Sequence, residues 1–97
     1  MAMHNPPHPG EFLTAVYLEP NELSARELAI KLDVSASTLH RVLKGQSAIS
    51  PDMALRLSKA LGRSPESWLA LQSRYDLWQA KRRVKLGRVG RVRLTAV

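Results

Sequence analysis

The stretch Ser24–Gly45, SARELAIKLDVSASTLHRVLKG, predicts two short helices joined by a tight turn. Ser24 is a favourable residue to precede a helix, and Glu27 follows it three positions later. The hydroxyl and the carboxylate of such a pair bond each other's free backbone amides in a capping box. The first helix of the pair is therefore expected to begin near Ala25.

This first helix carries a narrow apolar face. Leu28, Ala29 and Leu32 recur at helical spacing, and Ala29 is small enough for a second helix to cross close by. Asp33 follows directly and is expected to end the helix.

The second helix begins behind Ser35, a further N-cap residue, and ends at Gly45, which accepts the left-handed backbone that stops a helix. Its apolar residues are expected to point inward: Leu39, Val42 and Leu43. The outward residues are small or polar: Ala36, Ser37, His40, Arg41 and Lys44. A helix that is anchored on one face and polar on the other is the kind that proteins present to DNA.

In these features the stretch resembles the helix-turn-helix of the lambda-repressor-like, or XRE, family. That family has an alanine in the first helix, a glycine at the turn and branched apolar residues in the second helix. Ala29, Leu39 and Val42 match this pattern, whereas Asp33 stands where the family usually has the glycine. Aspartate is among the few residues that adopt left-handed backbone at modest cost, so we expect the turn to be kept.

The chain of 97 residues fits one domain with a single small core. The expected fold class is all-α: a compact five-helix lambda-repressor-like DNA-binding domain with a basic C-terminal tail. Prolines keep residues 1–10 extended. The helix-turn-helix domain covers 11–78, and the tail covers 79–97.

The other helices are predicted from their caps and their apolar spacing. The first runs over about 11–18 and ends at Pro20. The fourth opens at Ser50 and ends at Gly62, and the fifth opens at Ser64. The residues expected in the core are Phe12, Leu13, Val16, Ile49, Met53, Leu57, Ala60 and Leu61.

The fifth helix, from about residue 65, carries large apolar side chains on one stripe: Trp68, Leu71, Tyr75 and Trp78. This is more aromatic surface than four short helices readily cover, and aromatic residues are enriched in interfaces between subunits. The stripe is therefore predicted to be a dimer interface. The alternative is that these rings complete the monomer core, above all for Trp68.

Positive charge is concentrated at the end of the chain. The net charge is +7, yet residues 1–78 hold eight Lys/Arg and eight Asp/Glu. Residues 79–97 hold seven basic residues and no acidic one: Lys81, Arg82, Arg83, Lys85, Arg88, Arg91 and Arg93. A cationic arm on a neutral body favours polyanions such as nucleic acid, an acidic protein surface or an anionic membrane. A solvated terminus is the alternative.

The sequence does not decide between a short strand and disorder for the tail. Val92, Leu94 and Ala96 alternate with polar and basic residues, which is typical of a short strand with one apolar face. Gly87 and Gly90 favour disorder equally well.

In the fold that the resemblance implies, the second helix of the motif lies in the major groove with its first turn against base edges. The residues at the reading positions are Ala36, Ser37 and Arg41. Arg41 is the main candidate, because its guanidinium can donate two hydrogen bonds to a guanine edge. Contacts to the DNA backbone are assigned to Arg26, Ser35, Thr38, His40, Lys44 and Gln46.

Two departures weaken phosphate binding by the motif itself. Ala25 stands where the family usually has glutamine, and the loop after Gly45 carries no cation. The tail is a candidate for the missing contacts, to DNA or to RNA. Ala36 and Ser37 discriminate poorly between bases, so DNA shape is expected to carry part of the specificity.

Three further stretches narrow the resemblance: HPGEFL at 8–13, SAISPDMALRLSKALG at 47–62 and SPESWLALQSRYDLW at 64–78. Together with the motif they are similar to the HigA-type antitoxins. This resemblance implies a bacterial type II antitoxin that binds operator DNA as a homodimer and represses its own operon. Its partner would be a small basic HigB-like toxin, a RelE-like mRNA interferase.

Other classes of function find little support. The sequence has no cysteine, no glycine-rich phosphate loop and no paired carboxylates beside a base, so neither an enzyme nor a cofactor is predicted. His4 and His8 lie among prolines that prevent the helix on which they could pair as metal ligands. No signal peptide or membrane-length apolar run is present, so a cytoplasmic, nucleoid-associated protein is expected.

Two alternative functions stay open. The first is a solitary helix-turn-helix repressor without a toxin partner, which the motif allows equally. The second is a protein-interaction module with only nonspecific DNA affinity, which the missing glutamine and the uncharged loop allow.

Overall fold

The computed structural model describes residues 5–95, and over this range every regular element is helical. In chain order the elements are α1 (Pro9–Leu13), η1 (Thr14–Leu18), α2 (Ala25–Leu32), α3 (Ala36–Leu43), α4 (Pro51–Leu61) and α5 (Pro65–Arg83). Because η1 is a π-helical continuation of α1, the described part of the chain has the five helices that the sequence predicts. The all-α prediction is confirmed.

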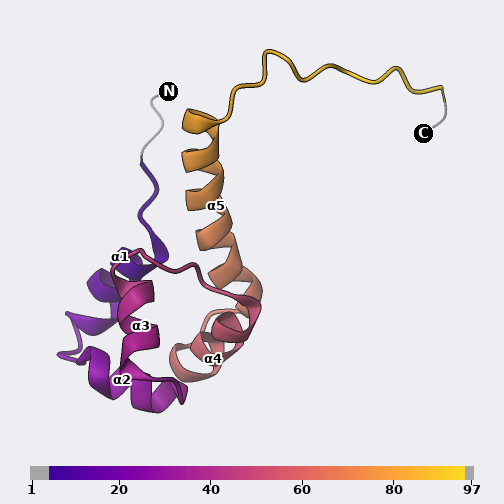
Figure 1. Cartoon of the computed structure of the whole chain (residues 1–97). Coiled ribbons are helices and arrows are strands. Elements are labelled where there is room, and N and C mark those ends of the chain that lie inside the picture. Colours follow the sequence, from indigo (N-terminus) through magenta and orange to yellow (C-terminus); the bar gives the residue numbers. More distant parts are fainter. Residues whose placement is uncertain (1–4, 96–97) are drawn as a thin grey trace.

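The shorter helices form a body, and α5 projects from it (Figure 1). α2 packs against α3 and α4, α1 packs against α3, and α5 packs against both α4 and α1. The C-terminal part of α5 extends beyond these contacts, which makes the molecule elongated, with extents of 54 × 30 × 25 Å.

Serine caps fix the starts of four helices. Ser24, Ser35, Ser50 and Ser64 each accept a hydrogen bond from the backbone amide three residues later, at 3.0–3.1 Å. These bonds satisfy amides that otherwise lack a partner in the first turn of a helix. The predicted starts of α2, α3, α4 and α5 are therefore confirmed.

The first helix begins two residues earlier than predicted, because His8 caps it. Its Nδ1 atom accepts a hydrogen bond from the amide of Gly10 at 2.9 Å, and the Glu11 carboxylate accepts one from the amide of His8 at 3.2 Å. An imidazole nitrogen thus replaces the usual hydroxyl of a capping box, and Pro9 fits the first helical position. The extended segment therefore ends at His8 instead of residue 10.

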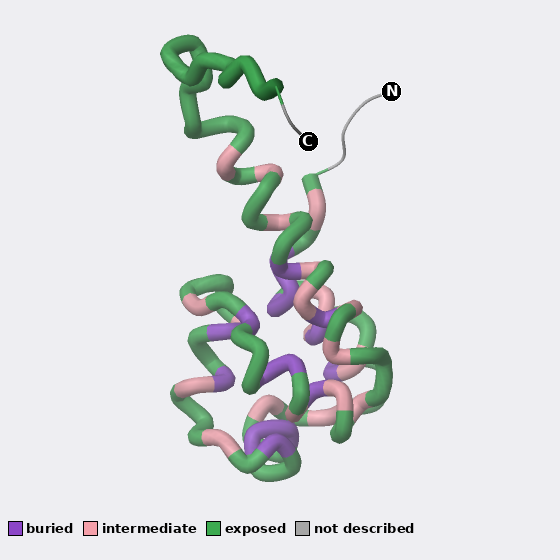
Figure 2. The backbone as a smooth tube through the Cα atoms, turned by 90° about the vertical axis from the view of Figure 1, so that its right-hand side faces the viewer, coloured by how far each residue is buried: buried purple, intermediate pink, exposed green. Residues whose placement is uncertain are grey.

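A single hydrophobic core lies inside the body, and exposed residues dominate the far end of α5 and the tail (Figure 2). The fully buried residues of the core include Leu13, Leu39, Ala54, Leu57 and Trp68, each 0% exposed. Ile49 is only 3% exposed, so the prediction that it plugs the core from the loop is confirmed.

Two predicted core residues lie at the surface instead. Val16 is 45% exposed, because it lies in η1, where the wider π-helical turn changes which side chains face inward. Ala60 is also exposed, and Ala54 takes its place in the core. Ala54 lies on the side of α4 that Leu57 occupies, whereas Ala60 lies at the solvent edge of that stripe.

The tail differs from its predicted boundaries. α5 continues to Arg83, five residues beyond Trp78, so the first basic residues belong to a helix. Residues 84–95 follow an irregular path without a strand, and the predicted alternation therefore makes no β ladder in this part of the chain. Ala96, the last residue of the proposed strand, lies outside the described residues.

Candidate nucleic-acid interface

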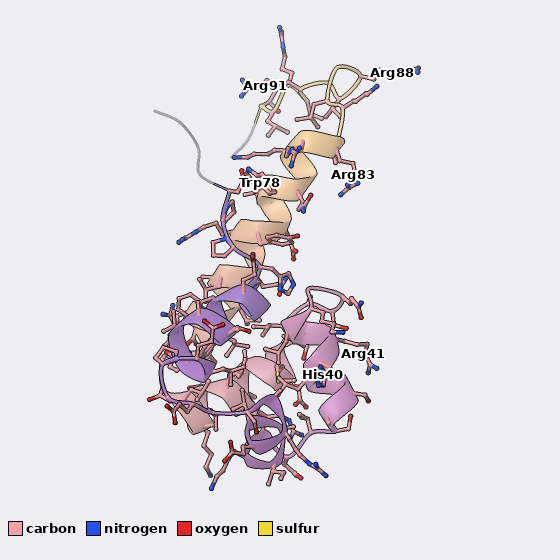
Figure 3. The ribbon with its side chains drawn as sticks, turned by 90° about the vertical axis from the view of Figure 1, so that its left-hand side faces the viewer. His40, Arg41, Trp78, Arg83, Arg88 and Arg91 are labelled. Atoms are coloured by element: carbon pink, nitrogen blue, oxygen red, sulfur yellow. The ribbon has the colours of Figure 1, made fainter. Side chains whose placement is uncertain are left out.

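Helix α3 presents a free polar face because its opposite face is locked into the core. Leu39 and Val42 are 0% and 2% exposed, whereas Leu43 is half-buried. The predicted base-reading residues all lie on the solvent side: Ala36, Ser37 and Arg41. In Figure 3 the side chains of His40 and Arg41 extend outward from α3.

The guanidinium of Arg41 is free to bind a ligand. Within residues 5–95 the only ion pair joins Arg56 to Asp52, so no carboxylate holds Arg41. Ser37 lies one helical turn before Arg41, and the two side chains therefore share a surface. A free guanidinium beside a hydroxyl can donate to the acceptors of a base edge or of a phosphate.

The first turn of α3 is held by its own hydroxyl groups. The Ser35 hydroxyl accepts a hydrogen bond from the Thr38 amide at 3.1 Å and donates to the Thr38 hydroxyl at 2.8 Å. It also lies 3.3 Å from the Ser37 hydroxyl. These bonds fix the first turn of α3, in which Thr38 is half-buried.

The other predicted backbone-contact residues surround α3 at the surface. Arg26 lies in the first turn of α2, and Gln46 lies in the loop after α3. His40 and Lys44 belong to the second half of α3 and its end. All four side chains are exposed, so the structure leaves the predicted contacts accessible.

The turn between α2 and α3 has the geometry that the motif needs. Asp33 has φ 58° and ψ 46°, which is left-handed backbone, so aspartate does occupy the glycine position. Gly45, with φ 76°, ends α3 as predicted.

At the start of α2, the Glu27 carboxylate accepts a hydrogen bond from the backbone amide of Ser24. This bond is the main cause that lowers the pKa of Glu27.

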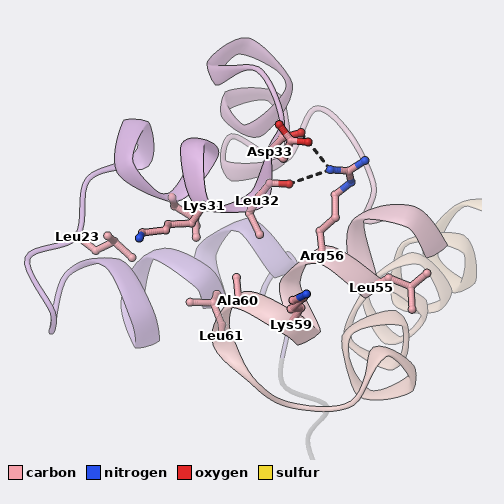
Figure 4. A pocket seen from close by; sticks show the side chains of 10 residues that line it. Leu23, Lys31, Leu32, Asp33, Leu55, Arg56, Lys59, Ala60 and Leu61 are labelled. Atoms are coloured by element: carbon pink, nitrogen blue, oxygen red, sulfur yellow. Dashed lines mark hydrogen bonds between the residues drawn. The ribbon is translucent and has the colours of Figure 1, made fainter.

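Arg56 holds this turn from α4, a role that sequence reasoning missed (Figure 4). Its Nη1 atom donates to the carbonyl oxygens of Leu32 at 2.9 Å and of Asp33 at 3.0 Å, and its Nε atom donates to Asp52. The hydrogen bond to Asp52 raises the pKa of Arg56. The four-residue spacing of Asp52 and Arg56 predicts their ion pair on one helix. Only the folded structure shows that the same guanidinium also bonds the turn between α2 and α3. Arg56 also lines a groove of about 770 Å³ between α2 and α4.

The His8–Gly10 turn supports the other end of α3. A Cβ atom on Gly10 would lie 2.2 Å from the carbonyl oxygen of Val42, so α1 and α3 approach as closely as glycine allows. The His8 ring packs edge-on against Tyr75, with 4.9 Å between the ring centroids. Burial lowers the pKa of His8, although Asp76 and Glu11 oppose this shift. This turn therefore joins α1, α3 and α5.

The predicted dimer stripe on α5 divides in two. Trp68 is 0% exposed and donates from Nε1 to the carbonyl oxygen of Gly62 at 3.0 Å. It belongs to the monomer core and has no surface to offer a partner, so the dimer assignment is wrong for this residue. Leu71, Tyr75 and Trp78 are half-buried and keep part of their surface accessible.

Within residues 5–95 no helix is both long and apolar enough to cross a membrane. The same part of the chain contains no cluster of three or more His, Cys, Asp or Glu side chains arranged to hold a metal ion.

Comparison with known proteins places this geometry in a family. A family model described as helix-turn-helix matches residues 16–68. An Escherichia coli K12 protein named as the uncharacterized HTH-type transcriptional regulator YddM is 38% identical over 92 residues, covering 95% of this chain and 97% of YddM.

Two solved structures are similar over most of the chain. Antitoxin GraA has a TM-score of 0.87 and 38% identity, covering 93% of this chain and 100% of GraA. Pseudomonas aeruginosa antitoxin HigA, solved with the higBA promoter, has a TM-score of 0.76 and 40% identity, covering 79% of this chain and 84% of the HigA chain. This chain therefore belongs to the XRE-type helix-turn-helix family, whose members are DNA-binding regulators rather than enzymes, and is a HigA-like antitoxin.

Proposed function

We propose that this protein is the antitoxin of a type II toxin-antitoxin system that binds operator DNA as a dimer, represses its own operon and neutralises a small basic HigB-like toxin of the RelE-like mRNA interferase class. The observation that carries the DNA-binding half is the anchored α3 with its free polar face and unpaired Arg41. The similarity to GraA along nearly the whole chain supports the antitoxin half. The protein would work in the cytoplasm, on the nucleoid.

Recognition would combine one strong base contact with weaker ones. Arg41 would donate two hydrogen bonds to a guanine, which is worth about 1–3 kcal/mol of discrimination. Ala36 would contact a thymine methyl, and Ser37 would bond with little selectivity. The backbone contacts would come from Arg26, Ser35, Thr38, His40, Lys44 and Gln46, and the shape of the duplex would supply the remaining specificity.

A dimer would match a two-fold symmetric operator. A single recognition helix covers few base pairs, and a dimer places two helices about 34–36 Å apart on successive major-groove faces. The accessible residues of the α5 stripe, Leu71, Tyr75 and Trp78, would form the contact between protomers.

The test of DNA reading is fluorescence anisotropy on the duplex directly upstream of the gene and on a scrambled duplex of equal length. Arg41→Ala should weaken binding to the upstream duplex by about 5- to 150-fold, the equivalent of one bidentate contact, and should leave the scrambled duplex nearly unaffected. Arg74→Ala is the matched control, because it also removes one exposed arginine but from α5 instead of α3. Equal affinity of the unmodified protein for both duplexes would instead favour the protein-interaction module.

The test of the antitoxin half is separate. The small basic protein encoded beside this gene should co-purify with the antitoxin, and co-expression should restore growth that the neighbour alone arrests. Sequence-specific DNA binding without any such partner would favour the solitary repressor, the function class to which the name of YddM points.

A further inference from the structure

We propose that the basic arm, defined as residues 81–93, binds the phosphate backbone of the duplex that flanks the operator, outside the contact made by α3. The arm would make the affinity for DNA depend on duplex length as well as on sequence. This inference rests on the proposed function, because it assumes that the helix-turn-helix engages an operator.

The charge of the arm is exposed and uncompensated. All seven of its basic side chains are exposed. Within residues 5–95 none of them forms an ion pair, because the single pair joins Arg56 and Asp52. The acidic residue that precedes the arm most closely, Asp76, instead accepts a hydrogen bond from Gln72 at 3.0 Å. The whole net charge of +7 is therefore presented to solvent by the arm.

The helix-turn-helix surface alone provides few cations. Of its basic residues, Arg26 and Lys44 are assigned to phosphates and Arg41 to a base edge, and the loop from Gly45 to α4 adds none. Two neutralised phosphates give a salt dependence of only about −1.8 in the slope of log K against log salt. The arm more than triples the number of cations that one protomer can bring to DNA.

The arm is also in a different place from α3. In Figure 3, His40 and Arg41 lie on the body, whereas Arg83, Arg88 and Arg91 lie beyond it at the far end of α5. Residues 84–93 follow an irregular path, and ten extended residues reach about 33 Å, close to one turn of B-DNA. An arm that starts away from α3 and reaches this far fits flanking DNA better than the bases under α3.

The conformation of the arm argues against a membrane as its partner. The amphipathic segments that lie in a membrane surface are helices with one apolar and one basic face. Beyond Arg83 the arm is not helical, and Gly87 and Gly90 interrupt it. An extended cationic segment can follow the line of phosphates along a duplex.

The experiment measures binding to two upstream duplexes, one limited to the operator and one extended by about one helical turn on each side. The unmodified protein should prefer the longer duplex and show the steeper salt slope on it. The triple variant Arg88→Gln, Arg91→Gln and Arg93→Gln should have a smaller preference, and its slope on the longer duplex should be smaller by about 2.7 per protomer. Binding of both proteins to the short duplex should agree within about two-fold at one salt concentration.

Two controls isolate the arm. Replacing the same three arginines by lysine keeps the charge and should preserve the length dependence, because phosphates are recognised mainly by charge. The variant Lys31→Gln, Lys59→Gln and Arg74→Gln removes three exposed cations from the body and should leave the length dependence unchanged. Loss of the length dependence in either control would overturn the proposal.

The binding experiment gives different results if the arm does not bind flanking DNA and if the proposed operator-binding function is wrong. If the unmodified protein prefers the upstream over the scrambled sequence but shows no length dependence, the arm does not bind flanking DNA. If it binds both sequences equally, the operator assignment fails instead. A single-stranded RNA of equal charge that displaces the arm from the longer duplex more effectively than duplex DNA would assign the arm to RNA and also overturn the proposal.

Discussion

His8 combines a structural hydrogen bond with a titratable side chain. Its Nδ1 atom accepts from the amide of Gly10, which it can do only in the neutral state. Burial lowers the pKa of His8 below the ordinary value of 6.5. The unfolded chain therefore takes up a proton at a higher pH than the folded chain does, and protonation favours unfolding.

The stability that His8 contributes is thus fully present above about pH 6.5 and is lost as the pH falls through that value towards the lower pKa of the folded state. We expect a lower Tm at pH 5.5 than at pH 7.5, measured by circular dichroism. His8→Asn keeps an N-cap side chain without titrating in this range, so it should reduce the difference in Tm. An unchanged difference in this variant would assign the pH dependence to other groups.

Gly10 is a position where a single methyl group decides the packing of two helices. In Gly10→Ala the new Cβ would meet the carbonyl oxygens of Val42 and Leu43 at 2.2 and 2.6 Å, so α1 must move away from α3. We expect a loss of about 1–3 kcal/mol, as in other overpacked sites. Gly87→Ala is the matched control, because no atom lies within 4 Å of its added Cβ. Equal Tm values for the two variants would contradict this account.

At the scale of the elements, the local signals in the sequence predict most of the structure. The starts of α2, α3, α4 and α5 follow from serine caps, whose hydrogen bonds involve residues three positions apart. The first helix was harder to predict, because its cap is a histidine and its second half is π-helical. Neither feature leaves a pattern in the spacing of apolar residues, so Val16 was assigned to the wrong face.

The α5 stripe gives a prediction about assembly. Trp78 is half-buried and lies under the guanidinium of Arg82, at 4.7 Å from its ring centroid. If the stripe is the dimer interface, Trp78→Ala should shift the protein to monomer at micromolar concentration, measured by sedimentation velocity, because aromatic side chains dominate such contacts. Leu77→Ala, at an exposed residue on a different face of α5, should leave the dimer intact. The reverse result would place the interface on the other face of the helix.

At the scale of the whole molecule, the candidate site was predictable where it depends on one helix and was missed where it depends on several. The exposed face of α3 follows from the anchoring of Leu39 and Val42 in the core. The bonds from Arg56 to the turn join residues 23 and 24 positions apart, and only the folded chain brings them together. The division of the α5 stripe into Trp68 and the outer residues likewise required knowledge of what the other helices cover.

The last prediction separates the body from the arm. Residues 84–93 are exposed and add nothing to the core, so a chain that ends at Arg83 should fold with a Tm within about 3 °C of that of the 97-residue chain. Trp68→Ala is the contrasting variant, because removal of this fully buried ring should lower the free energy of unfolding by about 3–5 kcal/mol. The shortened chain should still prefer the upstream duplex over the scrambled one, since Arg41 and the anchors of α3 remain. A large fall in Tm on truncation would mean that the residues after Arg83 stabilise the fold, and their four positive charges would then need a structural explanation before a DNA-binding one.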